Sequence, residues 1–207
     1  VLGSRMQQPA AIAERPAENG PAHLGCHAQR QPGLSYVGAA PPVGRCTPDM
    51  LAGLAAIADR EGDGTLRLTP WQSAIIPNIP RGRAAPAMTA LSALGMCCDP
   101  AAPRAGIIAC AGSTGCSRAA ADTKRDALAL ASMLQPDRSA ARGIHLSGCE
   151  KSCAAAFVAE MTLLATAPGC YDVFARDRGG GHKFGRPLAT GLTVDEAAER
   201  LTSHFAG

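Results

Sequence analysis

The sequence has few aromatic residues, no long apolar run and little excess charge. Only 3% of its residues are aromatic whereas 46% are hydrophobic, so we expect a core of Ala, Leu, Ile and Val. The longest uncharged run, residues 84–98, contains Pro, Thr, Ser and Gly, which argues against a membrane-spanning helix. A net charge of +3 is too small to indicate nucleic-acid binding. No charged segment followed by an apolar stretch opens the chain, so we expect a cytoplasmic protein without membrane or nucleic-acid partners.

Turn and capping residues divide the chain into a tail and two α/β units. Residues 1–30 lack hydrophobic periodicity and are predicted to form a flexible N-terminal tail or linker. The first unit, predicted over 31–97, has strand patterns at 34–40, 65–69 and 73–79 and helix patterns at 47–62 and 85–95. Pro77 in the third of these strands favours an edge position, because proline cannot donate a ladder hydrogen bond.

The second unit is predicted over residues 98–207. GIIAC (106–110) and GIHLSGC (143–149) are apolar runs that end in small residues and a cysteine, which is typical of buried strands. The other expected elements are a helix at 117–134, a hairpin of segments 161–166 and 170–176, a glycine-rich loop at 178–187, and a helix that begins at Thr193 with a capping box to Glu196.

The nine cysteines are the strongest functional signal in the chain. Without an export signal, metal or redox chemistry explains an odd count better than a disulfide framework does. Cys110 and Cys116 are spaced C-x5-C, and Cys149 and Cys153 are spaced C-x3-C. Each pair follows an expected strand, and open α/β sheets place their sites at strand ends. Four thiolates at adjacent strand ends are suited to a zinc ion or an iron–sulfur cluster.

The spacing of the cysteines favours an iron–sulfur cluster over zinc. Zinc ribbons use tight C-x2-C knuckles on both sides, and the clustered spacing of ferredoxins is also absent. Wider pairs leave room for a [4Fe–4S] cluster, and the intervening glycines and serines let the backbone approach inorganic sulfur. The alternative that these cysteines only pack in a core remains open. Cys26, Cys46 and Cys170 have no spacing partner, and Cys97 and Cys98 are adjacent, so their side chains point apart and one of them is expected in the core.

The combination of motifs resembles the cluster half of the nitrite and sulfite reductase superfamily. The segment LRLTPWQSAIIPNIP (66–80) is similar to the ferredoxin-like half-domain of that superfamily, in which an Arg-x-Thr strand lines the tetrapyrrole cavity. The resemblance implies an α/β (α+β) chain with a ferredoxin-like half-domain at 31–97. An α/β cluster domain at 98–207 would follow, and the four paired cysteines would hold its [4Fe–4S] cluster.

Finer detail resembles one branch of the superfamily, the precorrin-3B synthases of aerobic cobalamin biosynthesis. The similar segments are RLTPWQSAIIPNI, DPAAPR (99–104), ADTK (121–124) and IHLSGCEKSCA. This resemblance implies an oxidoreductase, an oxygen-dependent monooxygenase that converts precorrin-3A to precorrin-3B by ring hydroxylation and γ-lactone formation. It identifies no catalytic residue.

The branch resemblance also implies cofactors and partners. The cluster would relay electrons from NADH through an electron-donor system, and a mononuclear iron, with His182 as a candidate ligand, would activate O2. The precorrin substrate is a polycarboxylate, so cations must line its cavity. The candidate substrate-binding residues are Arg67, Thr69, Arg81 and Lys151.

Two other functions remain open. One is a siroheme-dependent sulfite or nitrite reductase half, in which the tetrapyrrole is a cofactor. The other is a non-catalytic iron–sulfur fragment that only transfers electrons. Members of the superfamily contain two homologous halves, and this chain resembles only the C-terminal one. We therefore expect a homologous N-terminal half, or self-association, to complete the cavity.

Overall fold

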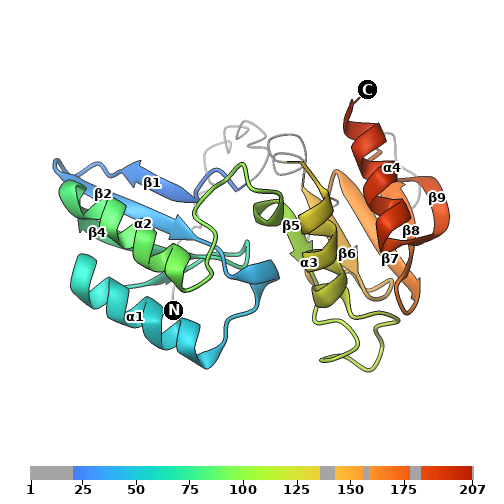
Figure 1. The fold of residues 1–207 in the computed structure, drawn as a ribbon, viewed down its shortest axis with the longest axis horizontal. Helices are drawn as coiled ribbons and strands as arrows, with labels where there is room; N and C mark the ends of the chain where they lie inside the picture. The colour runs from blue at the N-terminus through green and yellow to red at the C-terminus, as the bar shows by residue number, and fades with distance from the viewer. Residues whose placement is uncertain (1–20, 136–142, 156–158, 178–182, 207) are drawn as a thin grey trace, which may run out of the picture.

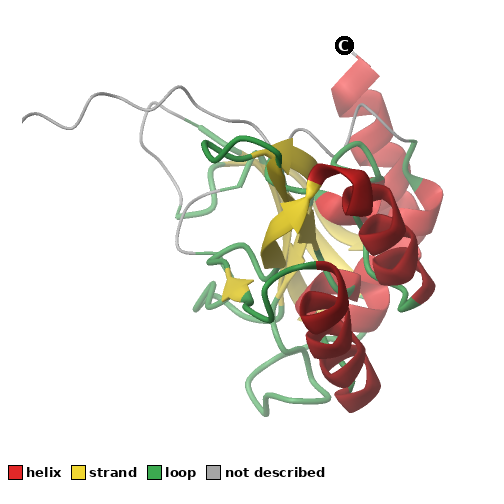
Figure 2. Ribbon diagram, turned by 90° about the vertical axis from the view of Figure 1, so that its left-hand side faces the viewer, coloured by secondary structure: helices red, strands yellow, loops and turns green. Residues whose placement is uncertain are grey.

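The computed structural model describes residues 21–135, 143–155, 159–177 and 183–206. The chain forms two α/β units, each built on one sheet, and they lie next to each other along the long axis of the molecule (Figure 1). In the side view, the helices lie together on one side of the strands (Figure 2). No helix in the described ranges is long and apolar enough to cross a membrane. His182, the candidate iron ligand, falls outside these ranges.

The first unit is a four-stranded antiparallel sheet in the order β1-β2-β4-β3. Its elements are β1 (Gly25–Ala28), β2 (Leu34–Ala39), α1 (Pro48–Glu61), β3 (Arg67–Leu68), β4 (Ala74–Pro80), the 3-10 turn η2 (Arg81–Arg83) and α2 (Ala84–Ala93). Buried side chains of both helices, such as Leu54 and Leu91, share one core with Val37 and Ile76 of the sheet. This layer of two helices on one sheet face matches the predicted ferredoxin-like unit.

Helix α1 begins and ends where its capping residues predict. The Thr47 hydroxyl accepts a hydrogen bond from the Met50 amide at 3.2 Å, and Pro48 occupies the first turn, where its missing N–H costs nothing. Gly62 follows the last helical residue. The helix predicted over 47–62 is therefore confirmed.

Three expectations for the first unit are wrong. Residues 25–28, assigned to the flexible tail, form β1 and pair with β2. The strand at 65–69 shrinks to two exposed residues. Strand β4, expected at an edge because of Pro77, lies between β2 and β3. Pro77 is tolerated there because neither neighbouring strand pairs with it. On one side the β2–β4 register is irregular opposite Pro77, where Asn78 has a φ of +58°, and on the other side β3 pairs only with Ala74 and Ile75.

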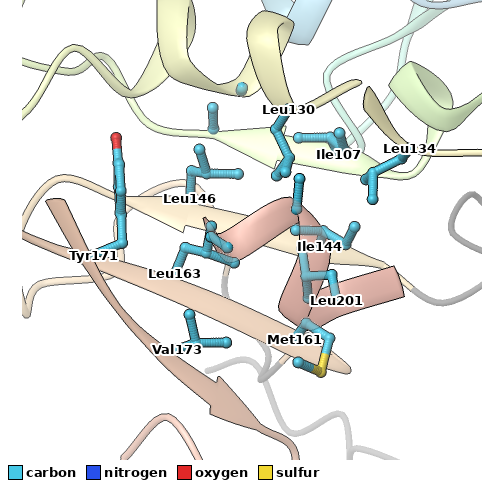
Figure 3. Close-up of a cluster of buried hydrophobic side chains, with 14 of the residues drawn as sticks. Ile107, Leu130, Leu134, Ile144, Leu146, Met161, Leu163, Tyr171, Val173 and Leu201 are labelled. Carbon is cyan, nitrogen blue, oxygen red and sulfur yellow. The ribbon is translucent and has the colours of Figure 1, made fainter. Parts of the chain in front are cut away.

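The second unit is a five-stranded sheet in the order β5-β6-β7-β8-β9, parallel from β5 to β7 and antiparallel from β7 to β9. Its elements are the 3-10 turn η3 (Pro103–Ala105), β5 (Ile107–Ala109), α3 (Thr123–Met133), β6 (Ile144–Ser147), β7 (Met161–Ala167), β8 (Cys170–Ala175), β9 (Arg186–Thr193) and α4 (Val194–Ala206). Alternate residues of the strands, such as Ile144 and Leu146, pack against Leu130 of α3 and Leu201 of α4 (Figure 3).

The predicted hairpin and capping box are confirmed, whereas two boundaries in this unit differ. The Glu196 carboxylate accepts from the Thr193 amide at 2.8 Å, and the Thr193 hydroxyl accepts from the Glu196 amide at 3.3 Å. Helix α3 starts at Thr123 rather than 117, because Asp122 caps it and the Ala120 amide donates to the Gly148 carbonyl instead. Part of the segment predicted as a glycine-rich loop forms β9.

The short 3-10 turn η1 (Pro42–Gly44) joins the two units. It belongs to the first unit in sequence, yet the side chain of Val43 is buried in the core of the second unit. Val43 has φ +43° and ψ +38°, a conformation that a β-branched residue rarely adopts. The residues that follow, Gly44 to Cys46, are thereby held against the end of β5.

Candidate functional site

An open cleft with a volume of ≈ 560 Å³ lies where the two units meet. Four of its lining residues belong to the first unit and six to the second. They are Gly44, Arg45, Cys46, Gln72, Ala109, Cys110, Ala111, Lys124, Cys153 and Ala154. The lining contains two cations and three thiols and no carboxylate, so the cleft is suited to an anionic or thiophilic ligand.

The floor of the cleft is formed by the ends of the parallel strands β5 and β6. Cys110 directly follows β5, and its amide donates to the Leu146 carbonyl at 3.2 Å. The Gly148 amide, just past β6, donates to the Cys110 sulfur at 3.2 Å. The first residue of the C-x5-C pair therefore touches the backbone that leads into the C-x3-C pair.

The four paired cysteines are all free thiols in the loops that follow β5 and β6. Cys110 and Cys153 line the cleft, whereas Cys116 and Cys149 are not among its lining residues. Three of the four are partly exposed and Cys153 is exposed. Two of the four predicted ligands thus share one cleft, and the role of all four as ligands stays a prediction.

Glycines allow the backbone segments in this part of the site to lie close to one another. A Cβ atom on Gly148 would lie 2.5 Å from the Ala119 Cβ and 3.3 Å from the Cys110 sulfur, which a side chain does not tolerate. Gly112, between the first two cysteines, has a φ of +69°, and a Cβ there would meet the Thr123 amide at 2.8 Å. Ser152 adopts a φ of +56° directly before Cys153, a position for which glycine is better suited.

The donor set fits a polynuclear cluster in its chemistry. Soft thiols with amide donors to sulfur are what iron–sulfur clusters use, and two strand ends supply them here. Among the residues that the structure describes, no three His, Cys, Asp or Glu side chains are grouped so as to hold a metal ion.

The four predicted substrate-binding residues lie outside the lining of the cleft. Arg67 is exposed on β3, at the edge of the first sheet. The hydroxyl of Thr69 lies 2.5 Å from the Ser73 hydroxyl and accepts from the Trp71 amide at 3.2 Å. Arg81 is exposed in η2, and Lys151 is exposed between the last two cysteines. None of the four is among the residues that line the cleft, and their contact with substrate stays a prediction.

The spacing of residues gave no sign of Arg45 or Cys46 as site residues. The Arg45 guanidinium reaches across to the C-x5-C loop, where its Nη2 atom donates to the Ala111 carbonyl at 3.5 Å and the Thr114 hydroxyl at 3.4 Å. Partial burial raises the pKa of the Cys46 thiol. Both residues precede α1 in a segment without a recognisable motif, so their place in the cleft follows from the docking of η1.

Lys124 is the third site residue that sequence reasoning missed, although it lies in the ADTK segment. Its side chain is buried, and its Nζ atom donates to the Ala109 carbonyl at 2.7 Å and to the Val43 carbonyl. Burial, together with the nearby positive charge of Arg45, lowers the pKa of Lys124 to about 8, and Cys110 opposes this shift.

Comparison with known proteins identifies the first unit. Residues 27–94 match the family described as the nitrite/sulfite reductase ferredoxin-like half domain. The ferredoxin–nitrite reductase of Synechococcus elongatus is 38% identical over 148 residues, which cover 68% of this chain and 28% of that protein. The chloroplastic ferredoxin–nitrite reductase of Betula pendula is 37% identical over 164 residues, covering 76% and 26%. Sulfite reductase [ferredoxin] 2 of Mycolicibacterium paratuberculosis is 30% identical over 166 residues, covering 72% and 30%.

Among solved structures, the Mycobacterium tuberculosis NirA protein superposes with a TM-score of 0.73 at 26% identity, over 92% of this chain and 37% of that one. The first unit is therefore a nitrite/sulfite reductase ferredoxin-like half domain. The predicted mixed α/β fold is confirmed. The chain spans between 26% and 30% of the length of these three curated relatives.

The interpretation as a precorrin-3B synthase is wrong, because these relatives are named nitrite and sulfite reductases. The segments that suggested this branch have structural roles. In ADTK, Asp122 caps α3 and Lys124 binds two backbone carbonyls. In DPAAPR, Asp99 accepts from the Ala101 amide and Pro103 starts η3. Such roles carry no information on substrate.

The relatives also give no support to NADH, O2, a precorrin or a mononuclear iron, since the names of the nitrite reductases specify ferredoxin.

Proposed function

We propose that this chain is the C-terminal half of a siroheme-dependent nitrite or sulfite reductase that receives electrons from ferredoxin. The observation that carries the proposal is the cleft between the units, where Cys110 and Cys153 face Arg45 and Lys124. The printed names of the relatives, ferredoxin–nitrite reductase and sulfite reductase [ferredoxin], supply the substrate class and the electron donor.

The residues of the chain would act in two ways. Cys110, Cys116, Cys149 and Cys153 would hold a [4Fe–4S] cluster in the domain at 98–207. The Gly148 N–H, already bonded to the Cys110 sulfur, would stabilise the thiolate. A bound cluster and siroheme supply the electron transfer and iron chemistry that reduction of the substrate needs.

The cations of the cleft would bind and orient anions. Nitrite, sulfite and the carboxylates of siroheme are all negatively charged, and a cleft with two cations and no acidic side chain attracts them. The forked guanidinium of Arg45 is suited to a carboxylate or a planar oxyanion. Arg67, Thr69, Arg81 and Lys151 remain candidates for contacts in the complete protein.

A second candidate is a non-catalytic iron–sulfur fragment that only transfers electrons. The chain spans less than a third of the length of each of the three curated relatives, so a homologous half or a second copy would have to supply the rest of the cavity. An activity assay separates the two candidates, because both predict a cluster and only the first predicts turnover.

The test begins with anaerobic reconstitution of the chain with iron, sulfide and siroheme. We expect iron and acid-labile sulfide to bind together, and siroheme to add sharp absorption bands to the broad absorption of the cluster. Reduction of nitrite and sulfite with reduced ferredoxin is then measured. Cys149→Ala should lose iron and sulfide, whereas the control Cys26→Ala, which removes an exposed thiol on β1, should keep both. Full retention by Cys149→Ala would show that the cluster ligands lie elsewhere.

A further inference from the structure

Lys124 is a buried cation in a place that its own helix does not favour. It is the second residue of α3, where the positive end of the helix dipole disfavours a lysine. Its side chain is paired with carbonyl oxygens only, and no ion pair joins it to an acidic side chain within the described ranges. A buried charge without a counter-charge is costly, so its presence needs an explanation.

The first part of the explanation is the position of η1. The Nζ atom of Lys124 joins the Val43 carbonyl of the first unit to the Ala109 carbonyl at the end of β5. Val43 forms this bond with left-handed backbone angles, whose cost the contacts of its buried side chain and its carbonyl must offset. The bond thus keeps Arg45 beside the loop that follows Cys110.

The second part is electrostatic. Lys124, Arg45 and Cys110 line one cleft, and Ala109, whose carbonyl binds Lys124, is bonded directly to Cys110. Hydrogen bonds to carbonyls solvate the ammonium group but leave its charge uncompensated. A cluster held by four thiolates carries net negative charge, and it would supply the counter-charge that the described side chains do not.

We propose that Lys124 is a positioning residue for this site, which fixes η1 against the Cys110 loop and provides the positive charge that stabilises an anionic, reduced cluster. The inference rests on the proposed function. A positive charge close to a cluster stabilises the reduced state and raises the reduction potential, and a group that only filled space would not have this effect.

The experiment measures the reduction potential and the iron content of the reconstituted cluster in the full chain and in four variants. Lys124→Met keeps the length of the side chain without charge, Lys124→Arg keeps the charge, and Arg60→Met removes one exposed positive charge from α1 as a control. Lys124→Gln is a second variant that removes the charge. We expect Lys124→Met to lower the potential by at least about 59 mV, a tenfold change for one electron. Lys124→Arg should recover at least half of that shift, and Arg60→Met should change the potential little.

Each outcome decides between the two proposals. If the parent chain binds no cluster, the proposed function and this inference both fail. If the parent binds a cluster and Lys124→Met leaves its potential unchanged, or Arg60→Met shifts it equally, the role of Lys124 is overturned and the proposed function stands. Where a Lys124 variant remains folded but loses iron, iron content is the readout. If Lys124→Arg keeps its iron while Lys124→Met and Lys124→Gln lose theirs, the result supports a role for the charge. If all three variants lose iron, that role is overturned.

Discussion

His145 illustrates how burial alone sets the behaviour of a single residue. It lies on β6 opposite Thr162 of β7, on the sheet face away from α3 and α4. Both side chains are 1% exposed, and neither the His145 Nε2 nor the Thr162 Oγ1 atom has a hydrogen-bond partner. Burial lowers the pKa of His145 to about 4. The residue is therefore neutral in the folded protein, consistent with a packed histidine rather than a charged one.

The shifted pKa predicts a loss of stability in mild acid. The unfolded chain binds a proton at His145 near its ordinary pKa of 6.5, whereas the folded chain resists protonation down to about 4. The shifted pKa of His145 therefore adds about 3 kcal/mol to the free energy of unfolding above pH 6.5, and this amount is lost as the pH falls toward 4. Urea unfolding of the parent and of His145→Leu across this range should show a smaller pH dependence in the variant. Equal pH dependence of the two proteins would contradict a lowered pKa of His145 in the folded protein.

A second residue-scale prediction concerns the buried hydroxyl of Tyr171. It donates to the Asp126 carboxylate at 2.7 Å and links β8 to α3, and burial, followed by this bond, raises the tyrosine pKa. Tyr171→Phe keeps the ring in the core and leaves one oxygen of Asp126 without its donor. We expect a loss of about 1–3 kcal/mol in unfolding free energy, measured in urea. Asp126→Asn, which keeps an acceptor but removes the charge, should cost less than Tyr171→Phe if the loss comes from the missing donor.

At the scale of elements, capping residues decide where helices begin. The box between Thr193 and Glu196 satisfies amides at the start of α4 that have no partner within the helix. Thr193→Ala should lower the unfolding free energy by about 1 kcal/mol. Glu196→Gln keeps an acceptor of the same length and should cost less than Glu196→Ala. Urea denaturation of the three variants gives this ranking, and equal losses for Gln and Ala would show that the glutamate does not act as a cap.

Strand order in the two sheets also belongs to the scale of elements. All four residues of β6 and the first five of β7 are buried, and the sequence showed both segments as apolar runs. The central position of β4 was not visible, because Pro77 is compatible with it only through an irregular register with β2. Local residue preferences therefore predicted which segments are strands better than they predicted which strands are neighbours.

At the scale of the whole molecule, residues 27–94 match one ferredoxin-like half domain, and the two cysteine pairs that are predicted to bind a cluster follow it. A substrate oriented from two sides loses rate steeply when one side is missing. We expect the reconstituted chain alone to reduce nitrite or sulfite at least about 100-fold more slowly than a full-length relative under the same conditions. Sizing chromatography combined with the assay tests this prediction. A monomer with the rate of the full-length enzyme would show that the second half is dispensable.

The sequence alone determined features that depend on near neighbours in the chain. The caps of α1 and α4 and the hairpin of β7 and β8 were predictable, because a cap or a turn is formed by residues a few positions apart. The ferredoxin-like half-domain was expected from the resemblance of residues 66–80 to a known family. The C-x5-C and C-x3-C pairs were equally visible, since a pair spacing is a local property. Their use as ligands remains a prediction.

Only the tertiary structure decided which residues line the cleft. Arg45, Cys46 and Lys124 meet there because η1 of the first unit docks into the core of the second, through a bond that joins positions 81 residues apart. No periodicity or spacing encodes such a contact, since it depends on the packing of two complete units. Arg67, chosen for the pattern of its strand, is instead exposed at a sheet edge. The side-chain pattern of a strand specifies which residues share a face, and long-range packing specifies what that face meets.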